Sequence, residues 1–430
     1  MPMNPVKPIV PIQEIDENPT APVTNTHRWA IVGLLFTASM INYMDRATVS
    51  FALPLISKEL SLGPMTKGLL LSAFFWSYAL MQIPIGHFAD KANLRWLYCG
   101  AFTLWSLAQG LTGFAGGLTA LVLFRLLLGI GESIYLPGGT KIVSLLFSAR
   151  ERGLPTGLFD MGTRTGLVLD GILIPWLLVH YGWRRMFMIV GFSALLWLIP
   201  WLLIYPRNLQ SGNSPNIRKE IGQVKTGRPE RLLTFNRNLL GLCLGFFCFD
   251  YYWYLLLTWL PDYLVTVRNL TILKAGLFAS IPYCVFGISQ PLGGWIGDIL
   301  SRRGWNEMRV RKSIIAAAFS TGLLLIPAAR VVDAGPAILL IMGGSLVGLA
   351  AANMLVMLQG SAPAREVGIW TGVYNFTGNL AGSLAPLLTG FLIAKTGSYH
   401  SSFALAVAIL LAGLLSLIFL IRERGTDHAN

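Results

Sequence analysis

The run Thr396–Ile421 reads TGSYHSSFALAVAILLAGLLSLIFLI and holds 26 residues without one Asp, Glu, Lys or Arg. An α-helix needs about 20 consecutive apolar residues to cross the hydrocarbon core of a bilayer. Six further charge-free stretches of 21 to 31 residues lie at 68–89, 96–124, 186–206, 275–297, 334–364 and 367–394. These runs predict a helical membrane protein with many spans, because a membrane β-barrel would show short segments of alternating polarity.

The composition also argues against a soluble protein. Of the 430 residues, 54% are hydrophobic and 12% are charged, whereas soluble globular proteins carry about 25% charged residues. The net charge of +13 would suggest nucleic acid as the partner of a soluble chain. With both termini in the cytoplasm, however, most Lys and Arg residues fall in cytoplasmic segments, as the positive-inside rule requires. The charge therefore reflects orientation in a bilayer, and no nucleic-acid partner is expected.

Twelve spans fit the hydrophobic pattern, six on each side of a long polar connection. We expect them at about 29–53, 67–89, 96–115, 118–147, 152–179, 183–205, 238–263, 272–300, 312–330, 335–359, 366–394 and 399–421. The expected segments are a disordered cytoplasmic tail (1–28), an N-terminal six-helix bundle (29–205), a cytoplasmic linker (206–237), a C-terminal six-helix bundle (238–422) and a cytoplasmic tail (423–430). The fold class is thus an all-α, multi-pass protein of the inner (plasma) membrane, expected to act as a monomer.

The two halves repeat each other in sequence. Residues 149–157 read ARERGLPTG and residues 364–372 read AREVGIWTG, so six of nine positions are identical. Parallel repeats of six spans are typical of transporters. The four cysteines and five histidines show no disulfide, metal-ligand or catalytic spacing. We therefore expect no enzyme activity, no metal and no cofactor.

Several motifs resemble those of the major facilitator superfamily. The segment GHFADKANLR at 86–95 is similar to the loop between spans two and three of that family, and GGWIGDILSRRG at 293–304 resembles its second copy. The residues assigned to this gating motif are Gly86, Asp90, Lys91, Asp298 and Arg302. Asn93 and Leu94 depart from the family pattern. The resemblance implies two pseudo-symmetric bundles of six helices.

A narrower resemblance begins in the first span. The sequence NYMDR at 42–46 is similar to the N-Y-x-D-R signature of the anion:cation symporter branch, whose members carry organic anions such as galactonate and glucarate. Further matches are WSYA at 76–79, QIP at 82–84, RLLLGIGE at 125–132, TWLP at 258–261 and GNLAG at 378–382. The resemblance implies proton-coupled import of a sugar acid.

Charged residues within the spans are candidates for function, since a charge at the centre of a membrane helix costs about 2.5–3.5 kcal/mol on insertion scales. Arg46 is expected to bind the substrate carboxylate, because the guanidinium fork suits two carboxylate oxygens; the alternative is an arginine reaching toward water at the span end. Asp45 and Glu132 are expected to carry the coupling protons. The alternative for both acids is a permanent ion pair.

Arg164 is harder to assign. Asp160 and Arg164 stand four residues apart on one helix and would neutralise each other there. Alternatively Arg164 is a second cation facing the substrate, which would imply a dianionic or differently shaped acid. The remaining residues assigned to substrate binding are Tyr43, Tyr78, Gln82, Arg125, Thr163, Trp370, Thr371, Asn375 and Asn379; helix packing is the alternative for each.

The sequence thus predicts a proton symporter that imports an organic carboxylate, a sugar acid first, by alternating access between the two bundles. Two protonated acids with one monoanion would move one positive charge per cycle. An uncoupled facilitator or exchanger of an aromatic or short-chain carboxylate and a non-transporting membrane sensor remain as alternatives.

Overall fold

The computed structural model describes residues 24–147, 153–207, 236–362 and 367–421, and these residues form helices and no β-strand. The first half contains α1 (Asn25–Leu60), α2 (Pro64–Lys91), α3 (Leu94–Leu111), η1 (Thr112–Phe114), α4 (Leu118–Glu132), α5 (Tyr135–Leu146), α6 (Gly153–Ala194), η2 (Leu195–Trp197) and α7 (Leu198–Ile204). The second half contains α9 (Arg237–Thr266), α10 (Ile272–Arg302), α11 (Glu307–Thr321), η3 (Gly322–Leu324), α12 (Leu325–Arg330), α13 (Ala334–Gly344), η4 (Ser345–Leu349), α14 (Ala350–Ser361), α15 (Val367–Thr396) and α16 (Tyr399–Leu420). The predicted all-α class is confirmed. Most of the predicted tails and linker lies outside the described residues.

Helices occupy every segment that the sequence predicts as a span. Eight helical segments within the described residues are long and apolar enough to cross a membrane. One of them, Leu154–Ile204, has 51 residues, which is far longer than one crossing requires. Gly182 has a φ of +73° inside this segment, so the chain reverses there and supplies two spans. The helices α1, α2 and α3 account for the remaining three spans.

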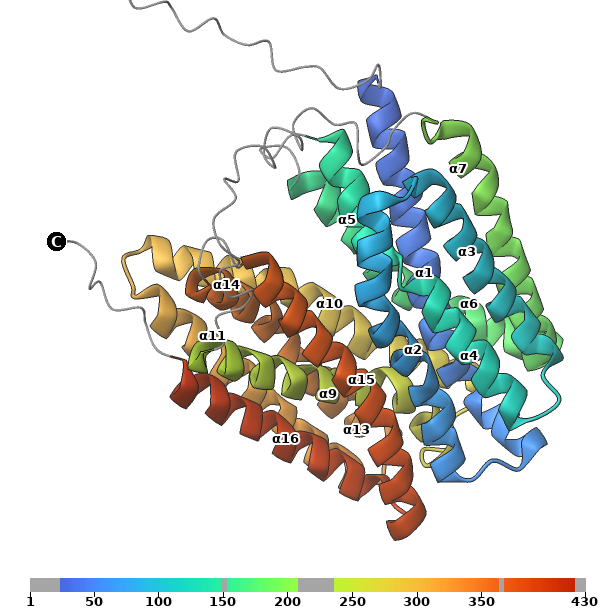
Figure 1. The fold of residues 1–430 in the computed structure, drawn as a ribbon. Coiled ribbons are helices and arrows are strands. Elements are labelled where there is room, and N and C mark those ends of the chain that lie inside the picture. Colours follow the sequence, from blue (N-terminus) through green and yellow to red (C-terminus); the bar gives the residue numbers. More distant parts are fainter. Residues whose placement is uncertain (1–23, 148–152, 208–235, 363–366, 422–430) are drawn as a thin grey trace, which may run out of the picture.

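The helices form two groups, one from each half of the chain (Figure 1). In the first group α1 packs on α6 and α4 packs on α2 and α3, while in the second group α9 packs on α15 and α16. The groups meet along three helix pairs, α2 with α15, α6 with α10 and α1 with α9. The predicted division into two six-helix bundles agrees with this arrangement.

Glycines bring the two halves into close contact on the side away from the chain termini. A Cβ atom on Gly68 of α2 would lie 2.7 Å from the Pro386 carbonyl oxygen of α15, and one on Gly276 of α10 would lie 2.2 Å from Pro175 Cγ of α6. Small residues allow membrane helices to approach in this way. We call these two crossings the seam.

An ion pair reinforces the seam. Lys67 Nζ of α2 lies 3.0 Å from Asp262 Oδ1 of α9, and Asp262 Oδ2 accepts a hydrogen bond of 2.5 Å from the Tyr399 hydroxyl of α16. Nearer the termini, the halves are joined by hydrogen bonds in a single layer, from Arg164 to Gln290 and from Asn375 to Gln82. Beyond that layer, no hydrogen bond or ion pair joins two described residues of different halves. The contacts between halves are thus concentrated away from the termini.

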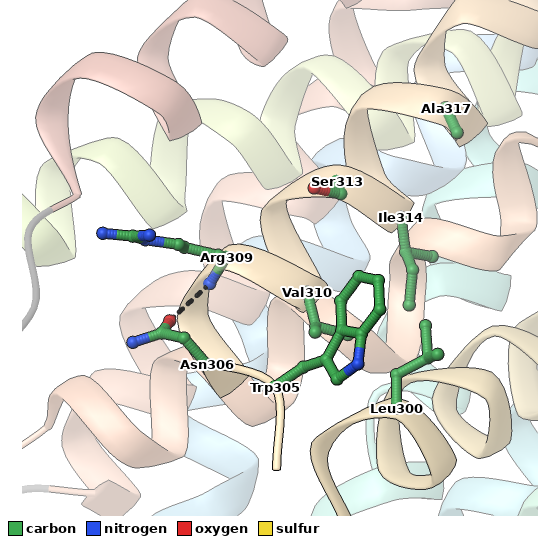
Figure 2. A pocket seen from close by; sticks show the side chains of 8 residues that line it. All are labelled: Leu300, Trp305, Asn306, Arg309, Val310, Ser313, Ile314 and Ala317. Carbon is green, nitrogen blue, oxygen red and sulfur yellow. Dashed lines mark hydrogen bonds between the residues drawn. The ribbon is translucent and has the colours of Figure 1, made fainter. Parts of the chain in front are cut away.

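A groove of about 500 Å³ lies on the outside of the second half, between the end of α10 and the first turns of α11 (Figure 2). It lies on the side of the termini, because Lys312 of α11 donates hydrogen bonds to the carbonyl oxygens of Ile418 and Ile421 at the end of α16.

Candidate functional site

The site is built around an ion pair between α1 and α4. Arg46 Nε donates to Glu132 Oε2 at 2.8 Å, and the two side chains are 3% and 0% exposed. Two glycines shortly before Glu132 permit this packing. A Cβ atom on Gly129 would lie 2.2 Å from Ser77 Oγ, and a Cβ atom on Gly131 would lie 2.7 Å from the backbone nitrogen of Trp105. The GIG sequence at 129–131 therefore lets α4 sit against α2 and α3, with Glu132 facing α1.

Aromatic rings surround the Arg46 guanidinium. Its central carbon lies 4.7 Å from the ring centre of Tyr43, 4.3 Å from that of Tyr78 and 5.0 Å from that of Phe74. Cation–π contacts are strongest where the cation is removed from water. Arg46 is therefore held by four side chains, and the alternative of an arginine that reaches out to water is not supported.

Arg125 lies on α4, two turns before Glu132. It also lies over the Phe74 ring, at 5.0 Å, and its Nη1 donates to the backbone oxygen of Asp45 at 3.4 Å. The two candidate cations thus share one phenylalanine. Glu132 pairs with Arg46 of α1 and not with Arg125, although Arg125 and Glu132 lie on the same helix.

Asp45 and Asp170 are buried close to this pair. Neither carboxylate oxygen of Asp45 has a hydrogen-bond partner among the described residues, and the side-chain amides of Asn42 and Gln109 are likewise buried without partners. Asp170 of α6 has one contact, a hydrogen bond of 3.5 Å from the Thr48 hydroxyl. Buried polar groups are normally satisfied, so this cluster is an exception that needs an explanation.

Arg164 points toward the other half of the molecule. Its Nη2 donates to Gln290 Oε1 of α10 at 2.8 Å. Asp160, one turn earlier on α6, instead accepts a hydrogen bond of 3.3 Å from the Tyr135 hydroxyl. No ion pair joins Asp160 to Arg164, so the alternative of mutual neutralisation is not supported. Arg164 is a cation between the halves with a neutral partner.

The other candidate residues divide into two sets. Gln82 and Asn375 meet between the halves at 3.5 Å, and Asn379 donates to the Asn375 backbone oxygen at 2.9 Å. Thr163 is turned to its own helix, where it donates to the Asp160 backbone oxygen. Trp370 is fully buried and Thr371 is half-buried on α15. Among these residues, the Gln82–Asn375 contact joins the two halves.

Sequence reasoning missed several groups at the site. Tyr254 of α9 packs on Phe75 of α2, in the other half, with ring centres 4.6 Å apart. Gln109 and Gln290 were also missed. Both are single amides within charge-free runs, and a polar side chain in such a run is the signal that would have identified them.

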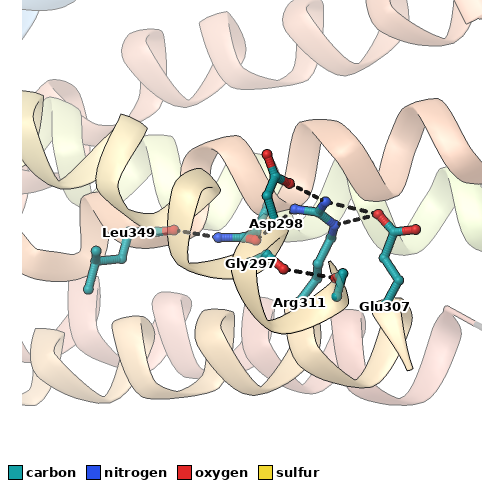
Figure 3. Close-up of polar contacts among 7 residues, drawn as sticks. Gly297, Asp298, Glu307, Arg311 and Leu349 are labelled. Atoms are coloured by element: carbon teal, nitrogen blue, oxygen red, sulfur yellow. Dashed lines mark hydrogen bonds and ion pairs between the residues drawn. The ribbon is translucent and has the colours of Figure 1, made fainter. Parts of the chain in front are cut away.

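The structure describes the side chains of the predicted gating motif mainly in its second copy. The side chains of Asp90 and Lys91 lie outside the described residues, and Gly86 is in the last turns of α2. In the second copy, Asp298 is bound by Arg311 of α11 at 2.9 Å, and Arg311 also contacts Glu307 at 2.9 Å (Figure 3). Arg302 is exposed at the end of α10. The cation that serves this motif is thus Arg311, which the sequence analysis did not select.

The chain is similar to known transporters along most of its length. The sequence model of the Major Facilitator Superfamily matches residues 35–386. A D-galactonate transporter of Escherichia coli O6:H1 is 31% identical over 419 residues, which cover 92% of this chain and 96% of that protein. A probable L-galactonate transporter of Escherichia coli K12 is 30% identical, with 92% of this chain and 89% of that protein covered. A probable galactarate/D-glucarate transporter of Pseudomonas putida is 32% identical, with 86% of each chain covered.

Solved structures agree with the fold. A bacterial homolog of the human lysosomal transporter Spinster, crystallised in an inward-facing and unoccupied conformation, aligns with a TM-score of 0.77 and 19% identity over 94% of this chain and 100% of that one. A D-xylose–proton symporter aligns with a TM-score of 0.73 and 14% identity over 92% of this chain and 98% of that one. At these identities the likeness concerns the fold alone.

Proposed function

Because this chain belongs to the major facilitator superfamily and is a membrane transporter rather than an enzyme, we propose that it carries a sugar-acid anion across the membrane together with protons. Relatives that cover most of the chain are named for galactonate and for galactarate or glucarate, all polyhydroxylated carboxylates. The buried arginines offer the charge that a carboxylate requires, and the amides of Gln82, Asn375 and Gln290 between the halves suit hydroxyl groups.

The observation that carries the proposal is the Arg46–Glu132 ion pair. Arg46 Nε already donates to Glu132 Oε2, while Arg46 Nη2 is buried without a hydrogen-bond partner among the described residues. A substrate carboxylate that binds the Nε and Nη2 edge with both oxygens therefore has to displace Glu132. A displaced, buried carboxylate without a partner is costly unless it binds a proton. Binding of the anion at Arg46 and of a proton at Glu132 Oε2 therefore favour each other. This competition for Arg46 would couple transport of the anion to transport of a proton.

Asp45 supplies the second proton site in this proposal. Both of its carboxylate oxygens are buried without a hydrogen-bond partner among the described residues, and burial in that state costs least when the group is neutral. Two protons with one monoanion would move one positive charge per cycle, worth about 2.3 kcal/mol per 100 mV of membrane potential.

Alternating access completes the mechanism. The seam and the Lys67–Asp262 pair hold the halves together away from the termini, and the substrate groups lie nearer the termini. With both termini in the cytoplasm of a bacterial inner membrane, this conformation is the one that releases substrate inward. Import requires that the seam open and that the halves close on the other side.

Transport by purified protein in liposomes tests the proposal. We expect an inward proton gradient to drive accumulation of D-galactonate or a related sugar acid, and an imposed inside-negative potential to increase it. Glu132→Gln should abolish accumulation but retain exchange of internal for external substrate, because its neutral amide imitates the protonated acid. Glu59→Gln is the matched control, since Glu59 lies at the end of α1 and pairs with Arg184 at the surface.

The outcomes separate the alternatives. Accumulation that ignores the pH gradient in the wild-type protein identifies a facilitator or exchanger. Gradient-driven accumulation by Glu132→Gln removes Glu132 from coupling. A thermal-shift screen with sugar acids, aromatic acids and short-chain acids identifies the substrate class, because a ligand of the folded state raises apparent stability; stabilisation by aromatic acids alone contradicts the sugar-acid assignment.

A further inference from the structure

The groove beside α11 combines an apolar slot with a polar end. Its apolar lining comes from Leu300, Val310, Ile314 and Ala317, and the Trp305 indole stands against the slot where α11 begins (Figure 2). Arg309, Ser313 and Ala317 follow one another at intervals of four residues and are all exposed. The described residues therefore leave this face of α11 uncovered, and the slot opens toward the bilayer. From residue 310 to residue 317 the helix rises about 10 Å.

Positive charge gathers at the polar end. Arg309 lines the groove, and Arg302 and Arg303 stand at the end of α10 between the lining residues Leu300 and Trp305 in the sequence. All three are exposed and form no ion pair with any described residue. The nearby acids Asp298 and Glu307 are both bound to Arg311, which removes them as partners. The exposed tryptophans Trp295 and Trp305, at 62% and 64%, are of the type that lies at the headgroup level of a membrane.

We propose that this groove binds one anionic glycerophospholipid from the leaflet on the side of the chain termini. The phosphate would lie among the three arginines, and the first part of one acyl chain would lie in the slot along α11. An anionic lipid fits better than a zwitterionic one, because the three unpaired arginines outweigh the single excess negative charge that Asp298 and Glu307 leave after sharing Arg311. The site is independent of the transported substrate.

The arginine at the corresponding place in the first half, Arg95, has a different environment. Arg95 is buried and donates to the backbone oxygens of Leu202 and Tyr205 at the end of the first bundle. Its charge therefore contributes to helix packing and is not exposed to the bilayer as that of Arg303 is.

Native mass spectrometry of the full-length protein tests the proposal. The protein is released from nanodiscs of phosphatidylcholine alone or of phosphatidylcholine with phosphatidylglycerol, and retained lipids are counted. We expect one retained phosphatidylglycerol on the wild-type protein. Replacement of each arginine by glutamine should weaken its binding about fivefold, since a basic residue at an anionic surface contributes about 1 kcal/mol. Arg330→Gln, an exposed arginine on the opposite side, is the control and should retain the lipid.

A second variant tests the slot. Ala317→Phe fills the slot without changing any charge, so it should also release the lipid. Retention by the triple variant Arg302→Gln/Arg303→Gln/Arg309→Gln, or equal retention of phosphatidylcholine by the wild-type protein, overturns the proposal. If the arginine variants lose the lipid but Ala317→Phe keeps it, the lipid binds through the surface arginines alone and the slot does not hold an acyl chain. Melting temperatures of all variants, measured in detergent, establish that they are folded.

Discussion

Removal of the Lys67 ammonium group should open the seam between the halves. Lys67 Nζ lies 3.0 Å and 3.2 Å from the two oxygens of Asp262, which is 1% exposed. In Lys67→Met the aliphatic stem remains but the charge is lost. Asp262 then keeps only the hydrogen bond from Tyr399, and a buried carboxylate in that state is strongly destabilising. The penalty applies only while the halves are closed here, because opening exposes Asp262 to water.

The magnitude follows from the contacts that are lost. Hydrogen bonds to charged groups contribute about 1.5–3 kcal/mol each. Lys67 is partly exposed at 12%, so we expect a loss at the lower end of the range for a buried pair. A change of about 1.5–3 kcal/mol shifts the balance between the closed and open seam by about 10- to 150-fold.

Thiol accessibility measures this shift. Ser72 is buried on the face of α2 that carries Gly68 and Phe75, both of which contact α15. In a background without the four native cysteines, Ser72→Cys should react slowly with a membrane-impermeant maleimide and faster when Lys67→Met is added. Lys395→Met removes an exposed lysine at the same side of the molecule and should leave the rate unchanged.

A double variant provides the decisive comparison. Lys67→Met with Asp262→Leu removes both charges and leaves no buried carboxylate unpaired, so the labelling rate should fall back toward that of the parent. If Lys67→Met leaves the rate within twofold of the parent, the ion pair does not hold the seam. If the double variant labels as fast as the single one, the unpaired carboxylate is not the cause.

Three further predictions concern the fold. Gly276→Leu should abolish transport while the protein still inserts and purifies, because even a Cβ atom there would lie 2.2 Å from a proline side chain of α6; normal uptake by this variant contradicts the role of the seam. Arg311→Gln should lower the melting temperature, since it leaves two half-exposed acids without their buried cation and removes the hydrogen bond from Arg311 to the buried Asn353; an unchanged melting temperature contradicts a stabilising role for this cluster. The pKa of Glu59 is lowered by hydrogen bonds from Trp183 and then Arg184, so this contact stabilises the protein at neutral pH and is lost as the pH falls through the lowered pKa. Arg184→Gln should therefore reduce stability at pH 7 more than in acid.

The sequence predicted most of the fold because the bilayer imposes a simple rule. Every span has to satisfy its backbone internally and present apolar side chains, so charge-free runs such as 396–421 identify helices directly. Several helices extend beyond the predicted spans. α1 begins at Asn25, where the Thr24 side chain caps it, and continues to Leu60, beyond the predicted limits of 29 and 53. Membrane thickness limits the apolar part of a helix and not its full length.

The sequence pointed to candidate residues but not to their contacts. The cost of intramembrane charge pointed to Arg46, Glu132 and Arg164. Arg46 and Glu132 are 86 positions apart in the sequence, and Arg164 and Gln290 are 126 positions apart. No local sequence pattern predicts such contacts. Arg164 illustrates this limit. Its spacing to Asp160 suggested an ion pair within one helix, whereas α6 packs against α10 and Arg164 donates a hydrogen bond to Gln290.

The chemistry of the site follows from a competition that only the packed structure contains. As separate residues, a buried arginine suggests an anion and a buried glutamate suggests a proton. The 2.8 Å contact between Arg46 and Glu132 makes one guanidinium the partner of both the glutamate and any incoming carboxylate. That contact depends in turn on Gly129 and Gly131, whose missing side chains bring α4 against α2 and α3. Substitution of either glycine should therefore disturb proton coupling as well as packing, although neither residue carries a charge.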